Sequence, residues 1–143
     1  MRRILRVLLL AGSAVTASLG IAAASEDPLY TSLGGREGIV AIVDQATANF
    51  LADGRIKNSF DNANIDQFKG LLTDQLCAVS GGPCVYKGRD MHVAHKGLHL
   101  TNYDFNALVE DLQDAMDSCQ LPLGVQSRLL ARLAPMQRQT VTK

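Results

Sequence analysis

In the stretch Gly82-Pro-Cys-Val-Tyr-Lys-Gly-Arg-Asp-Met-His-Val-Ala-His-Lys-Gly-Leu-His-Leu-Thr101 lie all three histidines of the chain. His92, His95 and His99 recur at steps of three and four, so one continuous helix would place them on one face. Gly97 argues against a continuous helix, because a glycine two residues after a histidine is typical of a helix end. We therefore expect a short helix that ends near Gly97 and is preceded by a loop.

A single imidazole held in this way is suited to be an axial metal ligand. Neutral imidazole is the commonest side-chain ligand of late transition metals and the usual proximal ligand of haem iron. A lone histidine is more often an ordinary surface or core residue, so a short motif by itself leaves that interpretation open. A third interpretation is a zinc, copper or nickel site shared by His92, His95 and His99.

The length and charge of the chain limit its organisation and its partners. With 143 residues it is long enough for one domain and too short for two ordinary ones. Three of its 14 basic side chains lie in the first 24 residues, which contain no acid. The remainder has 11 basic and 14 acidic groups, a net charge of −3. This mild acidity argues against nucleic acid or an anionic membrane surface as the main partner.

Residues 1–24 have the pattern of a signal peptide. Arg2, Arg3 and Arg6 precede an apolar run, and Ala22-Ala23-Ala24 before Ser25 fits the small-residue cleavage rule. An uncleaved anchor is the alternative, although the run is near the lower length limit for a membrane span and contains polar residues. We expect export to the periplasm or beyond, no membrane association after cleavage, and one mature domain at 25–143.

The rest of the chain predicts an all-α fold. Four segments have apolar residues at helical spacing, and no alternating β pattern of useful length is present. These residues are Ile39, Ile42, Val43, Ala46 and Phe50; Ile65, Phe68, Leu72, Leu76 and Val79; Phe105, Leu108, Val109, Leu112 and Met116; and Val125, Leu129, Leu130 and Leu133. Asn64 and Thr101 are the expected N-caps of the second and third helices. Pro135 should end or kink the fourth helix.

The cysteines fit an exported protein. Cys77 and Cys84 bracket Gly81-Gly82-Pro83, where a chain reversal can bring their α-carbons to disulfide distance. Such a bond would tie the end of the second long helix to the loop before His95. Cys119 is interpreted as a buried small apolar residue. A zinc site at Cys77 and Cys84 is the alternative, but the C-x-x-C spacing of such sites is missing.

Residues 29–137 resemble the group I truncated haemoglobins in the order and spacing of their motifs. These motifs are Leu29-Tyr30, Leu33-Gly34-Gly35, Phe50-Leu51-Ala52-Asp53, Phe60, Gly81-Gly82-Pro83, Tyr86, Gly88, Met91-x-x-Ala94-His95, Leu100-Thr101 and Phe105. The resemblance implies a globin-like two-over-two helical sandwich with haem b between its helix pairs. It further implies reversible binding of O2, NO or CO and an electron donor as a possible partner.

The resemblance also assigns positions to the haem pocket. His95 corresponds to the proximal ligand of the iron, and Phe60 to the phenylalanine that packs on the porphyrin face. Lys69 is a candidate partner of a haem propionate, together with Lys87 and Arg89. Further wall positions correspond to Tyr86, Met91, Leu100, Leu108 and Leu133.

The ligand side departs from the family pattern. Many members have a tyrosine on the first long helix and a glutamine on the second, both of which hydrogen-bond the bound gas. Thr47 and Leu72 stand at these positions, and Phe68 stands at the nearby gate. Threonine can still donate weakly, or it can bond a carbonyl of its own helix. We expect a mostly apolar distal pocket with weak dioxygen retention, and Gln75 is the candidate to restore polarity.

Two enzymatic activities are the alternatives to gas binding at the same iron. Dioxygenation of nitric oxide would need long-lived dioxygen binding and a reductase. Peroxidase turnover normally needs a distal acid or base to help split the O–O bond. Thr47, Phe68 and Leu72 supply neither group, so the sequence favours a gas binder with no assigned catalytic residue.

Overall fold

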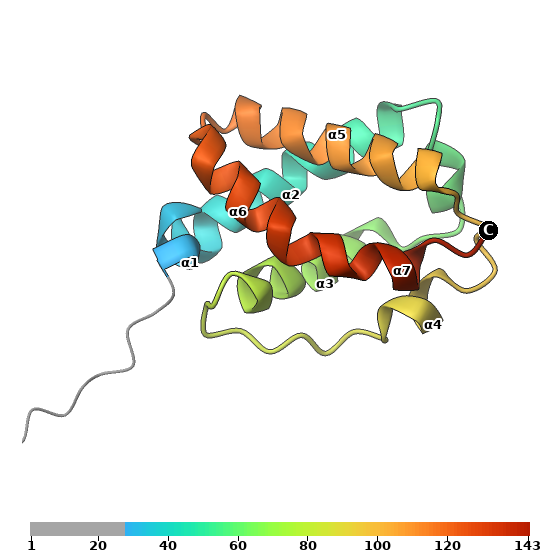
Figure 1. The fold of residues 1–143 in the computed structure, drawn as a ribbon, viewed down its shortest axis with the longest axis horizontal. Coiled ribbons are helices and arrows are strands. Elements are labelled where there is room, and N and C mark those ends of the chain that lie inside the picture. The colour runs from blue at the N-terminus through green and yellow to red at the C-terminus, as the bar shows by residue number, and fades with distance from the viewer. Residues whose placement is uncertain (1–27) are drawn as a thin grey trace, which may run out of the picture.

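A computed structural model of the protein describes residues 28–143, and within this range it contains helices and no strand (Figure 1). The predicted signal peptide at 1–24 lies outside the described residues. The α-helices are α1 (Pro28–Ser32), α2 (Gly35–Ala52), α3 (Ile65–Val79), α4 (Met91–His95), α5 (Asn102–Ser118), α6 (Leu123–Leu133) and α7 (Gln137–Thr140). The 3-10 helices are η1 (Lys57–Phe60) and η2 (Ala134–Met136). No helix in the described part of the chain combines the length and apolarity needed to cross a bilayer.

The four long helices form two pairs that pack against each other. Helix α2 contacts both α3 and α5, and α6 contacts α3 and α5 from the other side (Figure 1). The short helix α4 lies apart from this framework, and its main helix contact is with α7. The predicted all-α fold is therefore confirmed, with α2 as its central element.

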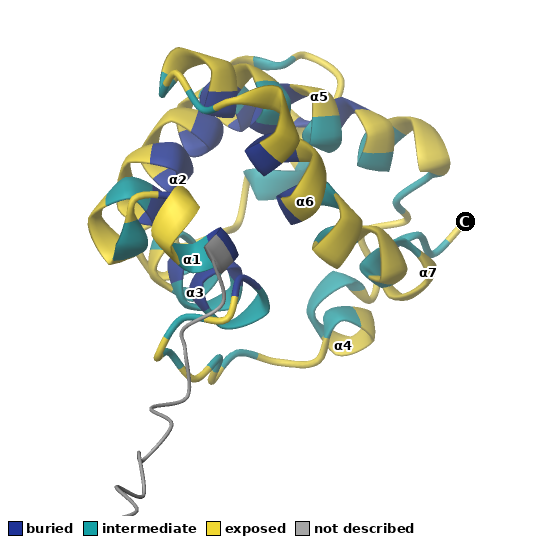
Figure 2. Cartoon of the chain, turned by 60° about the vertical axis from the view of Figure 1, so that its left-hand side comes forward, coloured by how far each residue is buried: buried dark blue, intermediate teal, exposed yellow. Residues whose placement is uncertain are grey.

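The core follows the first predicted stripe most closely. All five of its apolar positions, which span Ile39 to Phe50, are buried on α2. The other stripes are buried only in part. In Figure 2 the buried residues gather on α2 and on the parts of α3, α5 and α6 that lie towards the other long helices. Phe68, Leu72, Leu108 and Leu133 pack against this core but stay partly exposed.

Local signals set most of the helix ends. Asn64 Oδ1 accepts a hydrogen bond of 2.9 Å from the Gln67 backbone amide at the start of α3. Thr101 begins α5 with a full capping box, in which Asp104 is the second partner. Each such cap contributes about 1 kcal/mol. Helix α6 ends at Leu133, and the chain continues through η2, where Pro135 lies, into α7. The predicted caps and the break at Pro135 are confirmed.

The structure also contains elements that were not predicted. Pro28 opens α1, a position that suits proline because its missing amide would be unpaired there anyway. The link between α2 and α3 contains the 3-10 helix η1. Cys119 is the C-cap of α5 and packs against the core, but it is half-buried, so the expected burial is met only in part.

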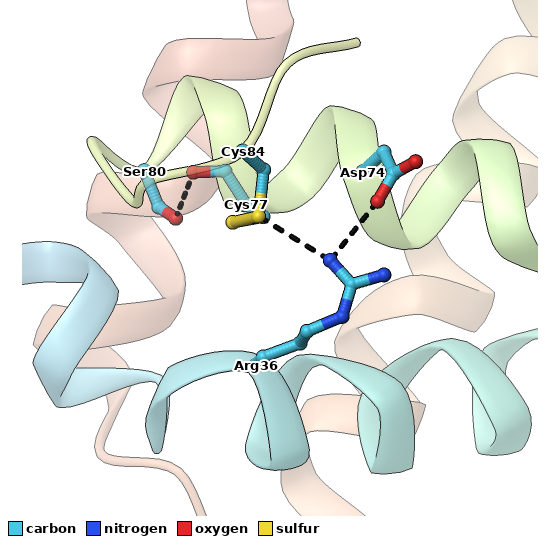
Figure 3. Close-up of a disulfide and its surroundings, with 5 residues drawn as sticks. All are labelled: Arg36, Asp74, Cys77, Ser80 and Cys84. Carbon is cyan, nitrogen blue, oxygen red and sulfur yellow. Dashed lines mark hydrogen bonds and ion pairs between the residues drawn. A yellow bond between two sulfur atoms is a disulfide. The ribbon is translucent and has the colours of Figure 1, made fainter. Parts of the chain in front are cut away.

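Cys77 and Cys84 form a disulfide in the structure, with their α-carbons 5.7 Å apart (Figure 3). Arg36 of α2 approaches this bond. Its Nη1 donates to Asp74 Oδ1 at 3.0 Å and lies 3.3 Å from Cys84 Sγ. Gly82 is required beside it, since a Cβ there would lie 2.7 Å from Cys77 Sγ and closer still to the Tyr30 ring. The end of α3 is thus tied to the segment that leads to α4.

Asp111 on α5 is a buried carboxyl group beside the end of α2. Its Oδ2 has no hydrogen-bond partner within the described chain, and the residue is 8% exposed. Burial raises the pKa of Asp111, and the negative charge of Asp53 raises it further. Arg55 lowers the pKa of Asp53 by hydrogen bonding to its carboxylate. The folded protein therefore binds a proton at Asp111 more tightly than the unfolded chain does.

Replacing Asp111 with asparagine is expected to stabilise the protein near neutral pH. In the wild type, the contribution of Asp111 to the free energy of unfolding is fully present below its ordinary pKa of 3.8. This contribution is lost as the pH rises through the raised pKa of the folded state. The asparagine side chain carries no charge and can donate to Asp53, so we expect a gain of about 1 kcal/mol at pH 7 and less at pH 4. Urea unfolding at both pH values measures this difference. Asp114→Asn, at an exposed neighbouring position, is the control, and an equal gain from it would contradict the account.

Candidate functional site

His95 is the last residue of α4, and its ring orientation is fixed from within that helix. Asp90 caps the helix by accepting from the His92 amide at 2.9 Å, and Gly97 follows the helix with a φ of 83°. His95 Nδ1 lies 2.7 Å from the Met91 carbonyl oxygen. A carbonyl only accepts hydrogen bonds, so Nδ1 is the donor, and in the neutral ring Nε2 then has the lone pair. This is the tautomer that a metal-binding imidazole needs.

Three phenylalanines, from α2, η1 and α3, form one aromatic cluster. The rings of Phe50 and Phe60 are stacked, with centroids 5.9 Å apart and planes within 4°. Phe68 meets Phe60 edge to face at 5.3 Å and Phe50 in the same manner at 6.4 Å. Phe50 is fully buried, whereas Phe60 and Phe68 are half-buried. Phe50 therefore supports the other two rings, which keep part of their surface free for a further apolar group.

The remaining predicted wall residues share this partial exposure. Helix α4 contributes no fully buried residue. The Tyr86 hydroxyl donates to the Arg89 carbonyl at 2.9 Å, and burial raises its pKa. The half-buried members are Leu72, Tyr86, Met91, Leu100, Leu108 and Leu133.

Thr47 on α2 is buried and uses its hydroxyl within its own helix. Its Oγ1 donates to the Val43 carbonyl at 2.7 Å. A hydroxyl has one hydrogen, so while this bond persists Thr47 cannot donate to a ligand. From the sequence, the Thr47 hydroxyl could donate weakly to a ligand or bond a carbonyl of its own helix, and the structure shows the second.

Gln75 lies one turn beyond Leu72 on α3 and reaches towards two methionines. Its Nε2 is 3.2 Å from Met91 Sδ and 3.4 Å from Met136 Sδ. Met136 lies in η2, far along the chain, and was not a predicted site residue. The Gln75 amide therefore contacts the thioethers of α4 and η2. Leu72, on the same helix, has no polar side-chain atom that could donate to a ligand.

Comparisons with known proteins agree with this arrangement. Residues 28–142 match the family model of bacterial-like globins. A group 1 truncated haemoglobin of Tetrahymena thermophila is 33% identical over 112 residues, which are 78% of this chain and 89% of that protein. The crystal structure of the truncated haemoglobin of Tetrahymena pyriformis in its Fe(III) form superimposes with a TM-score of 0.78. It is 31% identical, and the match covers 80% of this chain and 98% of that one.

The chain belongs to the group 1 truncated haemoglobin family. Its two-over-two helical sandwich is that of the solved truncated haemoglobins, as predicted from the sequence. Membership of the family makes it a haem-binding globin, and globins bind small gaseous ligands such as O2. The half-buried apolar residues of α3, α5 and α6 and the free Nε2 of His95 fit an iron porphyrin, which needs an apolar slot and one axial base.

Lys69 of this globin is engaged on another side of α3. Its ammonium forms an ion pair with Asp44 of α2, which raises the pKa of Lys69. Both residues line a surface cavity of about 380 Å³ between α2 and α3, and none of the other predicted wall residues lines it. The sequence could not reveal this partner, because Asp44 comes from another helix. Lys87 and Arg89 are exposed before α4.

The three histidines of the globin do not come together as a metal site. His92 and His99 are exposed, whereas His95 is half-buried. Within residues 28–143, no group of three or more His, Cys, Asp or Glu side chains is placed to hold a metal ion. The three-histidine interpretation and the cysteine zinc site therefore have no support from the fold. His99 has a φ of 53°, a left-handed conformation that is uncommon outside glycine.

Proposed function

We propose that this globin holds haem b through His95 and reversibly binds a diatomic gas, namely O2, NO or CO. The observation that carries the proposal is the His95 Nδ1 to Met91 carbonyl distance of 2.7 Å, which leaves Nε2 free to ligate iron. Bound haem would supply the iron at which the gas binds. All other roles belong to side chains of the chain itself.

The proposed roles of these side chains follow from their positions. Phe60 and Phe68 provide aromatic surface that is supported from behind by Phe50. Leu72 and Leu108 extend this apolar surface on α3 and α5. Burying such surface under a porphyrin stabilises the complex by about 25 cal/mol per Å². The same residues keep water away from the iron.

The distal side favours fast exchange of the gas over long retention. The Thr47 hydroxyl donates to Val43, and the Gln75 amide contacts two thioethers. Phe68 and Leu72 offer no donor. A charge-assisted hydrogen bond contributes about 1.5–3 kcal/mol, so a pocket without one should hold dioxygen weakly.

Repeated cycles of gas exposure test the proposal. The protein is loaded with haemin and reduced to the ferrous form. It is then exposed to dioxygen and returned to dioxygen-free buffer. We expect the absorption spectrum to change and to return over several cycles, because His95 keeps the iron in place. A spectrum that never responds to dioxygen or carbon monoxide, although haem is bound, would contradict gas binding. Myoglobin serves as the positive control.

Enzymatic use of the same iron is less well supported. Peroxide turnover gains from a distal acid or base, and Thr47, Phe68 and Leu72, which we assign to the distal side, supply neither. Conversion of nitric oxide would further require an electron donor and long dioxygen retention. These requirements fit the described side chains poorly, so reversible gas binding is the function that we propose.

We also propose that the globin is exported to the periplasm. The basic start, the apolar run and the Ala22-Ala23-Ala24 site support export, and the disulfide between Cys77 and Cys84 suits an oxidising compartment. Mature protein recovered from the periplasm should begin at Ser25. Recovery of the full-length chain in the membrane fraction would favour an uncleaved anchor.

A further inference from the structure

The short helix that carries His95 is not anchored by the core. None of the residues of α4 (Met91–His95) is fully buried. With five residues it is also too short to be a stable helix by itself. Its position must therefore come from the segments on either side of it and from α7, which is its main helix contact.

The segment after α4 is bonded to the C-terminal residues. The Leu100 amide donates to Thr142 Oγ1 at 3.1 Å. The Leu100 carbonyl accepts from the amides of Thr142, at 2.9 Å, and Lys143, at 3.1 Å. Leu100 thus has both backbone groups satisfied by a segment that is 42 positions away in sequence, and the Thr142 side chain supplies one of these bonds. Nearby, Gln137 Nε2 donates to Asn102 Oδ1 at 2.9 Å.

The start of α4 is linked to the same C-terminal region through Gln75 of α3. Met136 Sδ and Met91 Sδ both lie within 3.4 Å of Gln75 Nε2, so one amide bridges α3, α4 and η2. Thr140 is buried and its Oγ1 donates to the Met136 carbonyl at 3.0 Å, which fixes this end of the segment. Met91 is also the residue whose carbonyl orients the His95 ring.

We propose that residues 136–143 form a clamp that positions α4 and thereby His95, and that Thr142 is its main positioning residue. The clamp contacts α4 through α7 and bonds the loop beyond α4 at Leu100, while Gln75 of α3 links Met136 of the clamp to Met91. This inference rests on the proposed role of His95 as the haem ligand. Thr142 acts on α4 through the backbone of Leu100, which is itself a predicted wall position of the haem pocket.

The test compares Thr142→Val with Thr142→Ser. Valine has nearly the shape of threonine but removes the oxygen that accepts from the Leu100 amide, whereas serine keeps that oxygen. Thr31→Val is the matched control, because Thr31 is exposed on α1 and the substitution makes the same chemical change away from α4. The full chain is used throughout.

Hydrogen exchange of the haem-free protein gives the first measurement. We expect the valine variant at position 142 to raise the exchange rates of amides 91–100 by about three- to tenfold, the equivalent of one lost hydrogen bond. In the valine variant, the amides of α2 and α5 should keep their wild-type exchange rates. In Thr142→Ser and in Thr31→Val, the amides of α2, α5 and residues 91–100 should all keep their wild-type rates. Uniformly faster exchange in every helix would indicate general destabilisation and would overturn the positioning role.

Two measurements on haem-loaded protein complete the test. In Thr142→Val, haem transfer to excess haem-free myoglobin should be about three- to tenfold faster, and the iron–histidine stretching band in resonance Raman should broaden or shift. The serine variant should match the wild type in both. If Thr142→Val had the iron–histidine band and the haem transfer rate of the wild type, the clamp would be overturned and the proposed function would remain intact. Failure of the wild type to bind haem would instead overturn the proposed function.

Discussion

Replacing His95 with alanine is expected to abolish stable haem binding. The iron would lose its axial protein ligand, while the apolar walls around it would be unchanged. Mutation of a residue that only supports a metal ligand typically lowers metal affinity about 10- to 100-fold, so removal of the ligand itself should cost at least about a hundredfold. The measurement is the ratio of Soret to protein absorbance after gel filtration of haemin-loaded protein.

His92→Ala and His99→Ala are the matched controls for this experiment. Both residues are exposed, and neither orients the His95 ring, whose Nδ1 bonds the Met91 carbonyl. Each control should retain nearly the wild-type Soret ratio. Equal losses from all three substitutions would contradict the assignment of a single ligand and would revive the shared three-histidine site.

Replacing Leu72 with glutamine is expected to slow dioxygen release by about ten- to hundredfold, which corresponds to one charge-assisted hydrogen bond of about 1.5–3 kcal/mol. The substitution places an amide donor on the inner side of α3, where the wild-type side chain has none. Stopped-flow mixing of the dioxygen-bound ferrous protein with dithionite and carbon monoxide gives the release rate.

Two further variants show whether polarity causes the change. Leu72→Met keeps the position apolar at similar volume, so its release rate should stay near that of the wild type. Gln75→Leu should also leave the rate nearly unchanged, because the Gln75 amide contacts Met91 and Met136. If Gln75→Leu accelerated release as strongly as Leu72→Gln slows it, Gln75 would be the distal donor and the pocket would not be apolar.

Periodicity in the sequence predicted the framework because each helix buries one face. The stripe on α2 was right at every position, since this face of the helix packs against α3 and α5. On α3 the helical spacing of apolar residues identified the apolar face, but it did not show which part of that face other helices bury. Leu76 is fully buried, whereas Phe68 and Leu72 remain partly exposed. Spacing alone does not distinguish a face that is covered by another helix from one that is free to receive a cofactor.

The candidate site was predictable where its signals are local. The end of α4 near Gly97 and the bond from His95 to Met91 arise within a few residues of each other. The contacts that depend on the tertiary structure could not be read in this way. The pairing of Lys69 with Asp44 joins two helices, and that of Thr142 with Leu100 joins segments far apart in the chain.

Titration of the haem-free protein with haemin, followed by absorption spectroscopy, tests the central claim most directly. A globin that binds haem through His95 should saturate at one equivalent, with a sharp Soret band that differs from that of free haemin. A spectrum that equals the sum of free haemin and protein at every ratio would contradict the account.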